Sequence, residues 1–328
     1  MLRPTALVTA PLRGPALDDL RAVADVILDP WIDYRPIKLH GPEDLAARVR
    51  GTGATILICE ADFCMGEVLD LPLIVIGSTR GDPTNVDVEA ATAAGIPVVH
   101  TPGRNADAVA EMTIAMLMGV TRHLIAGHRD MVEGTVHGES LPYQRYRAWQ
   151  VAGRTIGLVG LGAVGRATKW RLEGLGMQVI SADPFAADAT HSLEALVAEA
   201  DVVSMHAAVT PETFGMMNAS VFGQMKPGAI YLNSARAGLH NVDDLVIALQ
   251  SGQVGAAALD HVDGETLPDG HPLLGTDGVG LPNVLLTPHI GGATFDVETR
   301  QTEMIVADVL AVLAGDRPVY CKNPEVFA

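Results

Sequence analysis

Apolar residues along the first hundred positions occur in short runs, and longer segments with helical spacing separate these runs. The runs predict buried strands, and they occupy residues 6–10, 56–59, 73–76 and 96–100. The longer segments predict helices at residues 17–28 and 86–94. Such alternation is typical of a parallel sheet made of βαβ units. The sequence Thr101-Pro102-Gly103 can continue neither element, so we place a domain crossover there.

The rest of the chain holds a second, longer alternating series. A strongly apolar helix is predicted at residues 107–122, and residues 127–150, which have little periodicity, are interpreted as an arm. Strands are predicted at residues 155–160, 178–182, 201–206, 229–233, 256–260 and 284–287. This series predicts a full doubly wound sheet. The last helix, at residues 296–314, has no strand series left to serve, so we expect it to return to the first domain.

Composition agrees with this α/β class and limits the partners. Hydrophobic residues make up 48% of the chain but aromatic residues only 4%, so the core is mainly aliphatic. The 22 basic and 39 acidic residues give a net charge of −17, which repels nucleic acid and anionic membranes. Neither is expected as a partner, and an anionic substrate would need a locally positive site.

The cysteines and the apolar segments indicate a cytoplasmic protein. The three cysteines have no CxxC spacing, which favours a reducing compartment. The N-terminal apolar run is too short for a signal peptide. The longest apolar helix segment, residues 112–120, is far shorter than the roughly 18 residues that suggest a membrane span.

A glycine-rich motif directly follows the predicted strand at residues 155–160 and opens a helix. In this GxGxxG pattern Gly160 permits a tight turn, Gly162 lets the backbone approach a pyrophosphate, and Gly165 allows close helix packing. Asp183 ends the next predicted strand, near the spacing of a ribose-binding acid. A carboxylate repels a 2′-phosphate, so NAD is favoured over NADP. The alternative is an ordinary glycine turn with a surface aspartate.

Two residues at predicted strand ends suit hydride transfer to a 2-oxo acid. Arg236 could grip the substrate carboxylate through its guanidinium, and His289 has the pKa range of a proton donor and acceptor near neutrality. Open α/β sheets bind their ligands at such strand ends. The alternative for a single histidine is a surface role or a satisfied place in the core, which is the more usual role of this residue type.

Over nearly its whole length the chain resembles the D-2-hydroxyacid dehydrogenases. The matching segments include, besides the glycine motif, Asn85-Val86-Asp87, Thr101-Pro102-Gly103-Arg104-Asn105, Thr210-Pro211-Glu212-Thr213, Met225-Lys226-Pro227-Gly228, Asn233-Ser234-Ala235-Arg236 and Thr287-Pro288-His289-Ile290-Gly291. The resemblance implies a catalytic set of Arg236, Glu265 and His289, in which the histidine is the acid and base, the glutamate pairs with it, and the arginine orients the substrate. Glu265 lies in an acidic loop at residues 261–265. If this loop is shifted by two residues, Asp263 would take the place of Glu265 as the catalytic acid.

The resemblance also implies the cofactor contacts, the fold and the assembly. Beyond the three glycines and Asp183, the cofactor-binding residues would be Ala163, Val164, Ala207, Ala208, Thr213, Ser234, Ala235, Asp260, Gly291 and Gly292. A Rossmann NAD domain, residues 104–292, would be inserted into a smaller flavodoxin-like substrate domain, residues 1–103 and 293–328. A homodimer would form through the helix after Asp107 and through the arm. Met112, Met116 and Met118 of that helix are expected to be exposed apolar residues that suit such an interface. The expected form is phosphoglycerate dehydrogenase-like and short, without a regulatory domain.

Several positions depart from the family's usual pattern. Ala237 replaces a glycine, Asn241 replaces an acid but can still cap a helix, and His261 replaces an apolar residue. His261 could be a second ionisable group near the catalytic residues, although we favour a plain surface role.

The most informative departure lies in residues 78–85, where the family typically binds the substrate carboxylate through a glycine-rich segment. The substrate-binding residues would here be Thr79, Arg80, Gly81, Arg104 and Arg236. Two additional arginines suit a phosphorylated or dicarboxylic sugar acid, such as 3-phosphoglycerate. The alternative is that Arg80 and Arg104 form ion pairs with Asp82, Asp107 or Glu111.

Other functions are also considered. A glyoxylate or hydroxypyruvate reductase, or a formate or phosphite dehydrogenase, could share the same cofactor motifs, and some relatives in the family are NAD-sensing corepressors. A metal enzyme would use His261, His271 and His289 with Asp260 or Glu265. No HExxH or similar ligand spacing occurs, so no metal is expected.

Overall fold

The computed structural model describes residues 3–137, 140–275 and 280–328. The chain divides into two compact units, Met1–Arg104 with Thr294–Ala328, and Asn105–Ala293. These boundaries lie one residue from those expected. Each unit contains a parallel sheet, so the predicted α/β class with an inserted nucleotide domain is confirmed.

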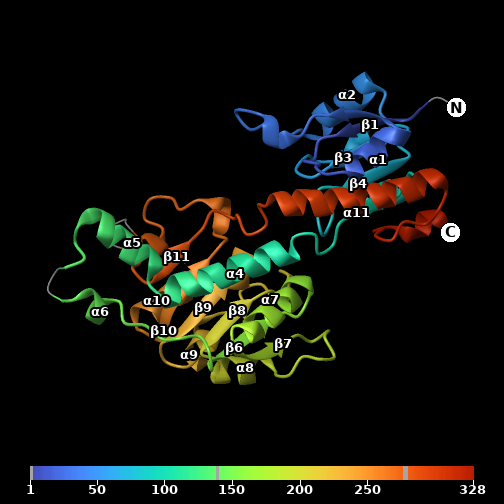
Figure 1. Ribbon diagram of the computed structural model, residues 1–328. Helices are drawn as coiled ribbons and strands as arrows, with labels where there is room; N and C mark the ends of the chain where they lie inside the picture. The colour runs from blue at the N-terminus through green and yellow to red at the C-terminus, as the bar shows by residue number, and fades with distance from the viewer. Residues whose placement is uncertain (1–2, 138–139, 276–279) are drawn as a thin grey trace. The chain divides into compact units, whose positions relative to one another are not determined.

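The first unit is built on a five-stranded parallel sheet with the order β2-β1-β3-β4-β5 (Figure 1). Its strands are β1 (Thr5–Val8), β2 (Asp25–Leu28), β3 (Ile56–Cys59), β4 (Val75–Ser78) and β5 (Val98–His100). Its helices are α1 (Ala16–Val23), α2 (Pro42–Thr52), α3 (Val88–Ala93) and α11 (Phe295–Ala314), with 3-10 turns η1 (Trp31–Asp33), η2 (Gly66–Val68) and η6 (Pro324–Phe327). This strand order is that of flavodoxin-like folds.

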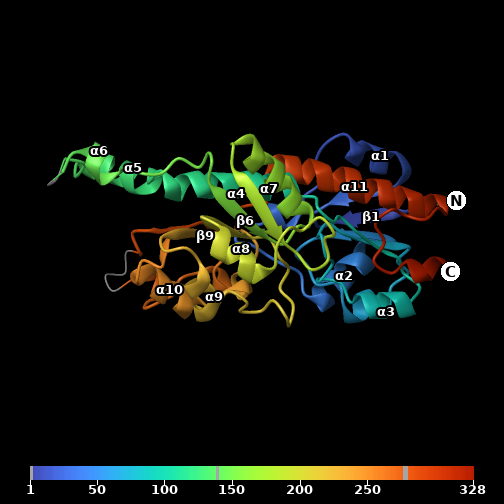
Figure 2. The same ribbon diagram turned by 90° about the horizontal axis from the view of Figure 1, so that it is seen from below.

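Both faces of this sheet are buried. Ala6 and Val8 of β1 pack with Leu20 of α1 and Ile305 of α11, whereas Leu7 packs in a separate cluster with residues of α2 and α3. Figure 2 shows α1 and α11 on one side of the sheet and α2 and α3 on the other. The last helix therefore returns to the first domain, as the sequence predicts.

The predicted helix at residues 17–28 is wrong in its second half. The helix ends at Val23, and Asp25–Leu28 form β2, which pairs only with β1 at the sheet edge. Ala24 is extended, and β2 has no buried residue. Val26, Ile27 and Leu28 of β2 form a short apolar run, but no glycine or proline separates them from α1 and most of the strand is exposed. Their spacing therefore resembles a continuation of the helix.

The second unit is built on a six-stranded parallel sheet with the order β11-β10-β9-β8-β6-β7. Its strands are β6 (Thr155–Val159), β7 (Gln178–Ala182), β8 (Val202–Met205), β9 (Ala229–Asn233), β10 (Val254–Leu259) and β11 (Val284–Leu286). Its helices are α4 (Ala106–Thr121), α5 (Leu124–Glu133), α6 (Pro142–Arg145), α7 (Ala163–Gly174), α8 (Leu193–Glu199), α9 (Ala219–Gln224) and α10 (Val242–Gln250), with 3-10 turns η3 (Ala237–Leu239), η4 (Asp263–Glu265) and η5 (Pro272–Leu274). The side chain of Asn241 accepts a hydrogen bond from the backbone N–H of Asp244, so this residue caps α10 as predicted.

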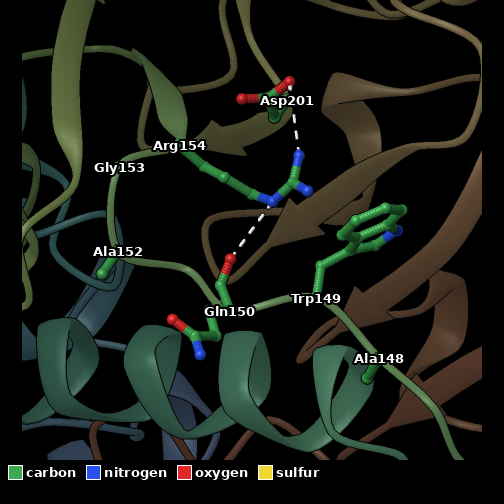
Figure 3. A pocket seen from close by; sticks show the side chains of 7 residues that line it. All are labelled: Ala148, Trp149, Gln150, Ala152, Gly153, Arg154 and Asp201. Atoms are coloured by element: carbon green, nitrogen blue, oxygen red, sulfur yellow. Dashed lines mark hydrogen bonds and ion pairs between the residues drawn. The ribbon is translucent and has the colours of Figure 1, made fainter.

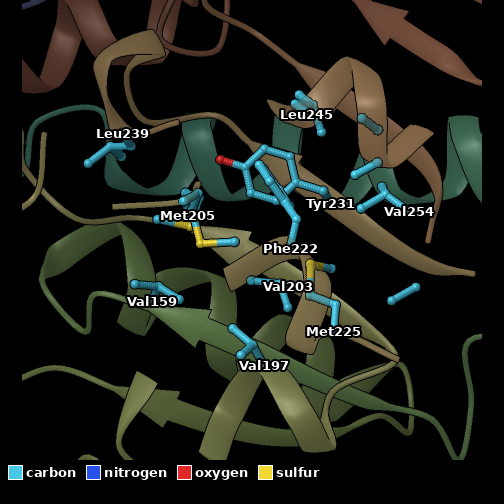
Figure 4. Close-up of a cluster of buried hydrophobic side chains, with 14 of the residues drawn as sticks. Val159, Val197, Val203, Met205, Phe222, Met225, Tyr231, Leu239, Leu245 and Val254 are labelled. Atoms are coloured by element: carbon cyan, nitrogen blue, oxygen red, sulfur yellow. The ribbon is translucent and has the colours of Figure 1, made fainter. Parts of the chain in front are cut away.

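Hydrophobic clusters cover both faces of the second sheet. On one face Phe222 of α9 meets Tyr231 of β9 edge to face, with ring centroids 5.3 Å apart, in a cluster that includes Met205 and Leu245 (Figure 4). On the other face α4 packs against the strands, and Met116 and Leu117 are fully buried there. The prediction that Met116 is exposed is therefore wrong, because α4 is a core helix of this unit.

The segment after α4 is more helical than its periodicity suggests. Residues 127–133 belong to α5, and α6 follows at Pro142–Arg145. Asp130 is buried and accepts a hydrogen bond from Tyr146 and an ion pair from Arg145, which holds the two helices together. In the described part of the chain no single helix has the length and composition of a membrane span, and α4 with α5 meets that description only across a bend of 58°.

All six strands of the second sheet run in one direction, so their carboxyl ends lie at one edge. The residues that follow these ends are those that the sequence nominates for chemistry, namely Gly160, Asp183, Ala207, Arg236, Asp260 and His289. The sheet topology therefore gathers the candidate site at this edge.

Candidate active site

The glycine motif forms the turn between β6 and α7. Gly160 has φ of +99°, and a Cβ there would lie 2.6 Å from the backbone nitrogen of Ala207. A Cβ on Gly165 would lie 2.2 Å from the carbonyl oxygen of Gly160. Gly162, in contrast, has no heavy atom within 4 Å of its would-be Cβ. Two of the glycines are therefore required by packing, and the third leaves open space beside the turn.

This open space adjoins the start of α7. Ala163 and Val164 form the first helical positions after Gly162, and no side chain caps the helix. Backbone N–H groups and the helix dipole at such an end favour an anion. The turn thus fits the pyrophosphate of a dinucleotide.

Asp183 lies directly beside the glycine turn. Its carboxylate accepts hydrogen bonds from the backbone N–H of Leu161 at 2.7 Å and of Phe185 at 2.8 Å. Arg166, on the first turn of α7, forms a bidentate ion pair with Asp188, with distances of 2.7 and 2.8 Å. No local signal in the sequence marks this pair, whose residues are 22 positions apart. The pair occupies the guanidinium that could otherwise attract a 2′-phosphate.

The loop after β8 is closed by its own threonine. Thr213 Oγ1 donates to the carbonyl oxygen of Ala208 at 2.6 Å and accepts from the backbone N–H of Thr210 at 2.7 Å. Thr213 therefore orders the segment that contains Ala207 and Ala208. Burial of His206, which lies just before that segment, lowers the pKa of its imidazole to about 4 and keeps it neutral at physiological pH.

Asn233 holds the backbone of Arg236 in place. Its Oδ1 accepts from the backbone N–H groups of Ala235 and Arg236 at 3.0 and 3.2 Å, and its Nδ2 donates to the carbonyl oxygen of Arg236 at 2.9 Å. In the described part of the chain the exposed guanidinium of Arg236 has no carboxylate partner, and it donates only to the carbonyl oxygen of Ala235. This positioning role of Asn233 depends on the folded loop and has no signal in the sequence.

The side chain of Ser234 faces into the unit. Its hydroxyl is buried and lies 2.7 Å from Thr113 Oγ1 of α4. Only the backbone of Ser234 is thus available for a cofactor contact.

Glu265 is the acid that meets His289. Glu265 Oε1 lies 2.9 Å from His289 Nδ1, and the two side chains are 57% and 44% exposed. Both residues have positive φ, 58° and 54°, a conformation that non-glycine residues seldom adopt. Asp263, the alternative acid, makes no hydrogen bond or ion pair with this histidine among the described residues and instead lies near His240.

Asp260 fixes the loop that carries His289. Its buried carboxylate accepts from Thr287 Oγ1 at 2.6 Å and from the backbone N–H groups of Ile290 and Gly291 at 3.0 and 2.8 Å. A Cβ on Gly291 would lie 2.8 Å from Asp260 Oδ2, so glycine is required there. Gly292 is similarly close to a side chain, with its would-be Cβ 3.1 Å from Asn105 Nδ2.

His261 does not have the surface role that the sequence analysis favours. It is only 5% exposed, and its ring centroid lies 3.6 Å from that of His289. Burial, followed by the charges of His289 and Arg236, lowers the pKa of His261 to about 4. The residue is covered because β10 and β11 are neighbours, which brings the segments after them together. His261, Glu265 and His289 form a cluster whose ligand atoms lie within 4.8 Å of one another.

The remaining predicted substrate residues belong to the first unit. Thr79 is buried, and Gly81 is exposed with its carbonyl oxygen 2.8 Å from His100 Nδ1. Arg80 donates to the carbonyl oxygen of Glu60 at 2.6 Å and to Thr84 Oγ1 at 3.1 Å. No carboxylate forms an ion pair with Arg80 within the described residues.

Arg104 is neutralised by a carboxylate. Its guanidinium lies 2.6 Å from Glu60 Oε1 and also contacts Gln301, while Trp31 Nε1 donates to Glu60 Oε2 at 3.0 Å. The anticipated alternative, an ion pair, is therefore right for Arg104 but with a different partner. The carboxylates proposed for that role pair elsewhere: Asp82 with Lys322, and Asp107 and Glu111 with Arg171.

A shallow hollow of about 590 Å³ lies at the opposite end of the second sheet (Figure 3). Arg154 crosses it, with its guanidinium 4.7 Å from the Trp149 ring, 3.9 Å from Asp201 and 3.1 Å from the Gln150 carbonyl oxygen. These residues precede β6 and β8, whereas ligands of open α/β sheets bind beyond the carboxyl ends. The hollow is thus separate from the candidate active site.

Comparisons with known proteins place the chain among dehydrogenases. The family model described as D-isomer specific 2-hydroxyacid dehydrogenase, NAD binding domain, matches residues 114–291. The chain is 33% identical to glyoxylate reductase of Thermofilum pendens, over 100% of this chain and 96% of that protein. It is also 33% identical to D-3-phosphoglycerate dehydrogenase of Mycobacterium tuberculosis, over 90% of this chain but 54% of that protein. Among solved structures, the TT0316 protein of Thermus thermophilus has a TM-score of 0.81 and 37% identity, covering 97% of this chain and 99% of that chain.

Proposed function

The chain belongs to the D-isomer specific 2-hydroxyacid dehydrogenase family, an NAD-dependent oxidoreductase family acting on CH–OH groups, and we propose that its substrate is a small 2-hydroxy or 2-oxo acid with a second anionic group. The observation that carries the proposal is the 2.9 Å contact of Glu265 with His289, at the same sheet edge as Arg236, whose guanidinium has no carboxylate partner among the described residues. NAD, when bound, accepts or supplies the hydride at C2 of the substrate.

The residues of the chain supply the proton and the orientation. Glu265 binds Nδ1 of His289, which leaves Nε2 to give a proton to the C2 oxygen in reduction and to take it back in oxidation. The guanidinium of Arg236 binds the C1 carboxylate, and Asn233 keeps its backbone in place. Asp260 holds the His289 loop through three hydrogen bonds.

The cofactor is held mainly by backbone. The first backbone N–H groups of α7, at Ala163 and Val164, would hold the pyrophosphate beside Gly162, and Asp183 would accept hydrogen bonds from the adenosine ribose. The other residues with this proposed role follow the strand ends and are Ala207, Ala208, Thr213, Ser234, Ala235, Gly291 and Gly292.

Arg80 is the candidate for the second anion of the substrate. No carboxylate neutralises it in the described residues, whereas Arg104 is neutralised by Glu60. An unpaired guanidinium binds a phosphate or carboxylate with little competition. This distinction favours a phosphorylated or dicarboxylic acid that Arg80 recognises, with Arg104 holding the segment around Glu60.

The reaction is tested by NADH oxidation with a panel of plain, dicarboxylic and phosphorylated 2-oxo acids. At least one acid should be reduced, and His289→Asn should lower kcat by about 10²- to 10⁴-fold, because the proton donor is lost. His128→Asn, which removes an exposed imidazole of α5, serves as the matched control. If no acid in the panel is reduced, the enzymatic proposal fails, and a nucleotide-sensing binding protein becomes the better explanation.

The substrate class is tested with Arg80→Ala and Arg104→Ala. Loss of Arg80 should lower kcat/KM for the phosphorylated acid by about tenfold or more, since a hydrogen bond to a charged group contributes about 1.5–3 kcal/mol, and should leave the plain acid nearly unaffected. Loss of Arg104 should lower stability instead, because Glu60 is left partly buried without its cation. Unchanged selectivity in Arg80→Ala would contradict a second anion site at this residue.

We also propose a homodimer. Apolar side chains are exposed on α5 and the segment after it, among them Ile125 at 60%, Met131 at 67%, Val132 at 74% and Trp149 at 74%. Such exposure favours burial against a second copy of the chain.

A further inference from the structure

Two imidazoles and one carboxylate meet beside the catalytic pair. His261 follows β10, Glu265 lies in η4, and His289 follows β11. One nitrogen from each imidazole and one oxygen from the carboxylate lie within 4.8 Å of one another. Histidine nitrogen and carboxylate oxygen are ligands that Zn²⁺ binds readily, and His₂Glu is a known protein ligand set for it.

The cluster is held in place by contacts of its own loops. The backbone N–H of His289 donates to the carbonyl oxygen of Asp260 at 2.9 Å, and that of Glu265 donates to the carbonyl oxygen of Val262 at 3.1 Å. Rigid loops lower the cost of bringing three ligands together on an ion. The ligands do not need a large rearrangement, because the rings of His261 and His289 are already in contact at 3.6 Å.

The cluster is also accessible on one side. His261 is buried at 5% exposure, whereas Glu265 and His289 are 57% and 44% exposed. An ion could therefore reach Glu265 and His289 from solvent, while the buried His261 closes the inner side of the cluster. Three protein ligands leave a fourth position of a tetrahedral ion open to water or to a carboxylate.

We propose that His261, Glu265 and His289 bind a divalent transition-metal ion of the Zn²⁺ class, and that the bound ion inhibits the enzyme. The ion replaces the proton on Nδ1 of His289, which otherwise lies between this nitrogen and Glu265. Loss of the Nε2 proton would then leave an imidazolate instead of a neutral imidazole, so His289 becomes too weak an acid to protonate the substrate. The inhibitory consequence rests on the proposed function, but the binding site itself does not.

Binding is tested with chelator-treated, dialysed protein and Zn²⁺ alone, by isothermal titration calorimetry. The unmodified protein should bind one ion at this site, and His261→Val should bind it at least about tenfold more weakly, because one direct ligand is lost. His128→Asn, which removes an exposed imidazole elsewhere, should bind as the unmodified protein does. Equal affinity of the unmodified protein and His261→Val would overturn the proposal.

A second variant guards against misfolding of His261→Val, whose substitution is buried. Glu265→Gln changes an exposed side chain and should also weaken Zn²⁺ binding by about tenfold or more. Unchanged binding in Glu265→Gln would likewise overturn the site.

Inhibition is measured separately, with a 2-oxo acid that the unmodified enzyme reduces. Zn²⁺ should inhibit the unmodified enzyme reversibly, and His261→Val should need at least about tenfold more Zn²⁺ for the same inhibition. Zn²⁺ binding without inhibition would refute the inhibitory role. If no acid is reduced, the proposed function fails, while the calorimetric comparison still decides the metal site.

Discussion

Glu265 and His289 are two of the three non-glycine residues with positive φ in the described chain. Such conformations cost on the order of 1–3 kcal/mol each, and they persist only where neighbouring contacts hold them. For His289 these contacts come from Asp260, and for Glu265 from Val262 and from His289 itself. The strain is therefore concentrated on the pair that we propose to move the proton.

Asp183 should determine the choice between the two nicotinamide cofactors. Its carboxylate repels a 2′-phosphate, so NADH should bind at least about tenfold more tightly than NADPH. In Asp183→Ser this preference should fall to about threefold or less, measured by fluorescence titration. Asp269→Ser, which removes another exposed acid, should keep the preference. Equal affinities in the unmodified protein would remove this role from Asp183.

His240 should contribute to a loss of stability in acid. Burial lowers its pKa to about 4, below the value of about 6.5 in the unfolded chain. Between these values the unfolded state binds the extra proton, so stability is intact above about pH 6.5 and falls as the pH decreases toward 4. Burial also lowers the pKa values of His206 and His261 to about 4, so these two residues reduce stability over the same pH range.

The variant His240→Asn tests this linkage. Its amide oxygen can replace His240 Nδ1, which lies 3.0 Å from Asn233 Nδ2. The loss of unfolding free energy between pH 7 and pH 4.5, measured with urea, should be smaller by roughly 2 kcal/mol in the variant. An identical pH dependence in both proteins would show that His240 does not titrate in this way.

At the level of elements, the loops after β10 and β11 act as one piece. Asp260 follows β10 but accepts three hydrogen bonds from residues 287, 290 and 291, which follow β11. Because the two strands are parallel neighbours, one carboxylate can satisfy donors from the next loop. The position of His289 thus depends on an acid outside its own loop.

Asp260→Asn should disrupt both loops. An amide places an N–H group against backbone N–H donors, so we expect a loss of about 2–4 kcal/mol in unfolding free energy together with a lower kcat. Asp263→Asn, an exposed acid of the same region, should change neither quantity much. Thermal unfolding and steady-state kinetics measure the two effects, and a fully active, equally stable Asp260→Asn would exclude the coupling.

At the scale of the whole molecule, the exposed apolar side chains of α5 lead to a prediction about assembly. Sedimentation should give twice the 34.4 kDa of one chain. The double change Met131→Asp and Val132→Asp should produce a folded monomer, because it places charge on two exposed apolar positions of the proposed interface. Ile247→Asp, at a 64% exposed position of α10, should remain dimeric. A monomeric unmodified protein would contradict the homodimer.

The chain pattern was sufficient to predict the two parallel sheets and the glycine turn, whereas Glu265 and most of the proposed cofactor contacts came from the resemblance to the family. The reason is that the sheets and the turn depend on neighbours in the chain: buried strands are continuous apolar runs, and the glycine turn must lie between a strand and a helix. Once the strands are parallel, the residues after them must meet at one edge, which brings Arg236 and His289 to the same part of the sheet.

Contacts between distant residues required the folded chain. Glu60 and Arg104 are 44 positions apart, and nothing local marks them as partners. The same holds for His261 against His289 and for the burial of Met116, which depend on loop paths and on the packing of α4. The edge strand β2 was missed because no turn residue separates it from α1 and because it pairs with a neighbour on one side only. Local spacing constrains which elements form, whereas side-chain pairing and burial are set by the other elements that each one packs against.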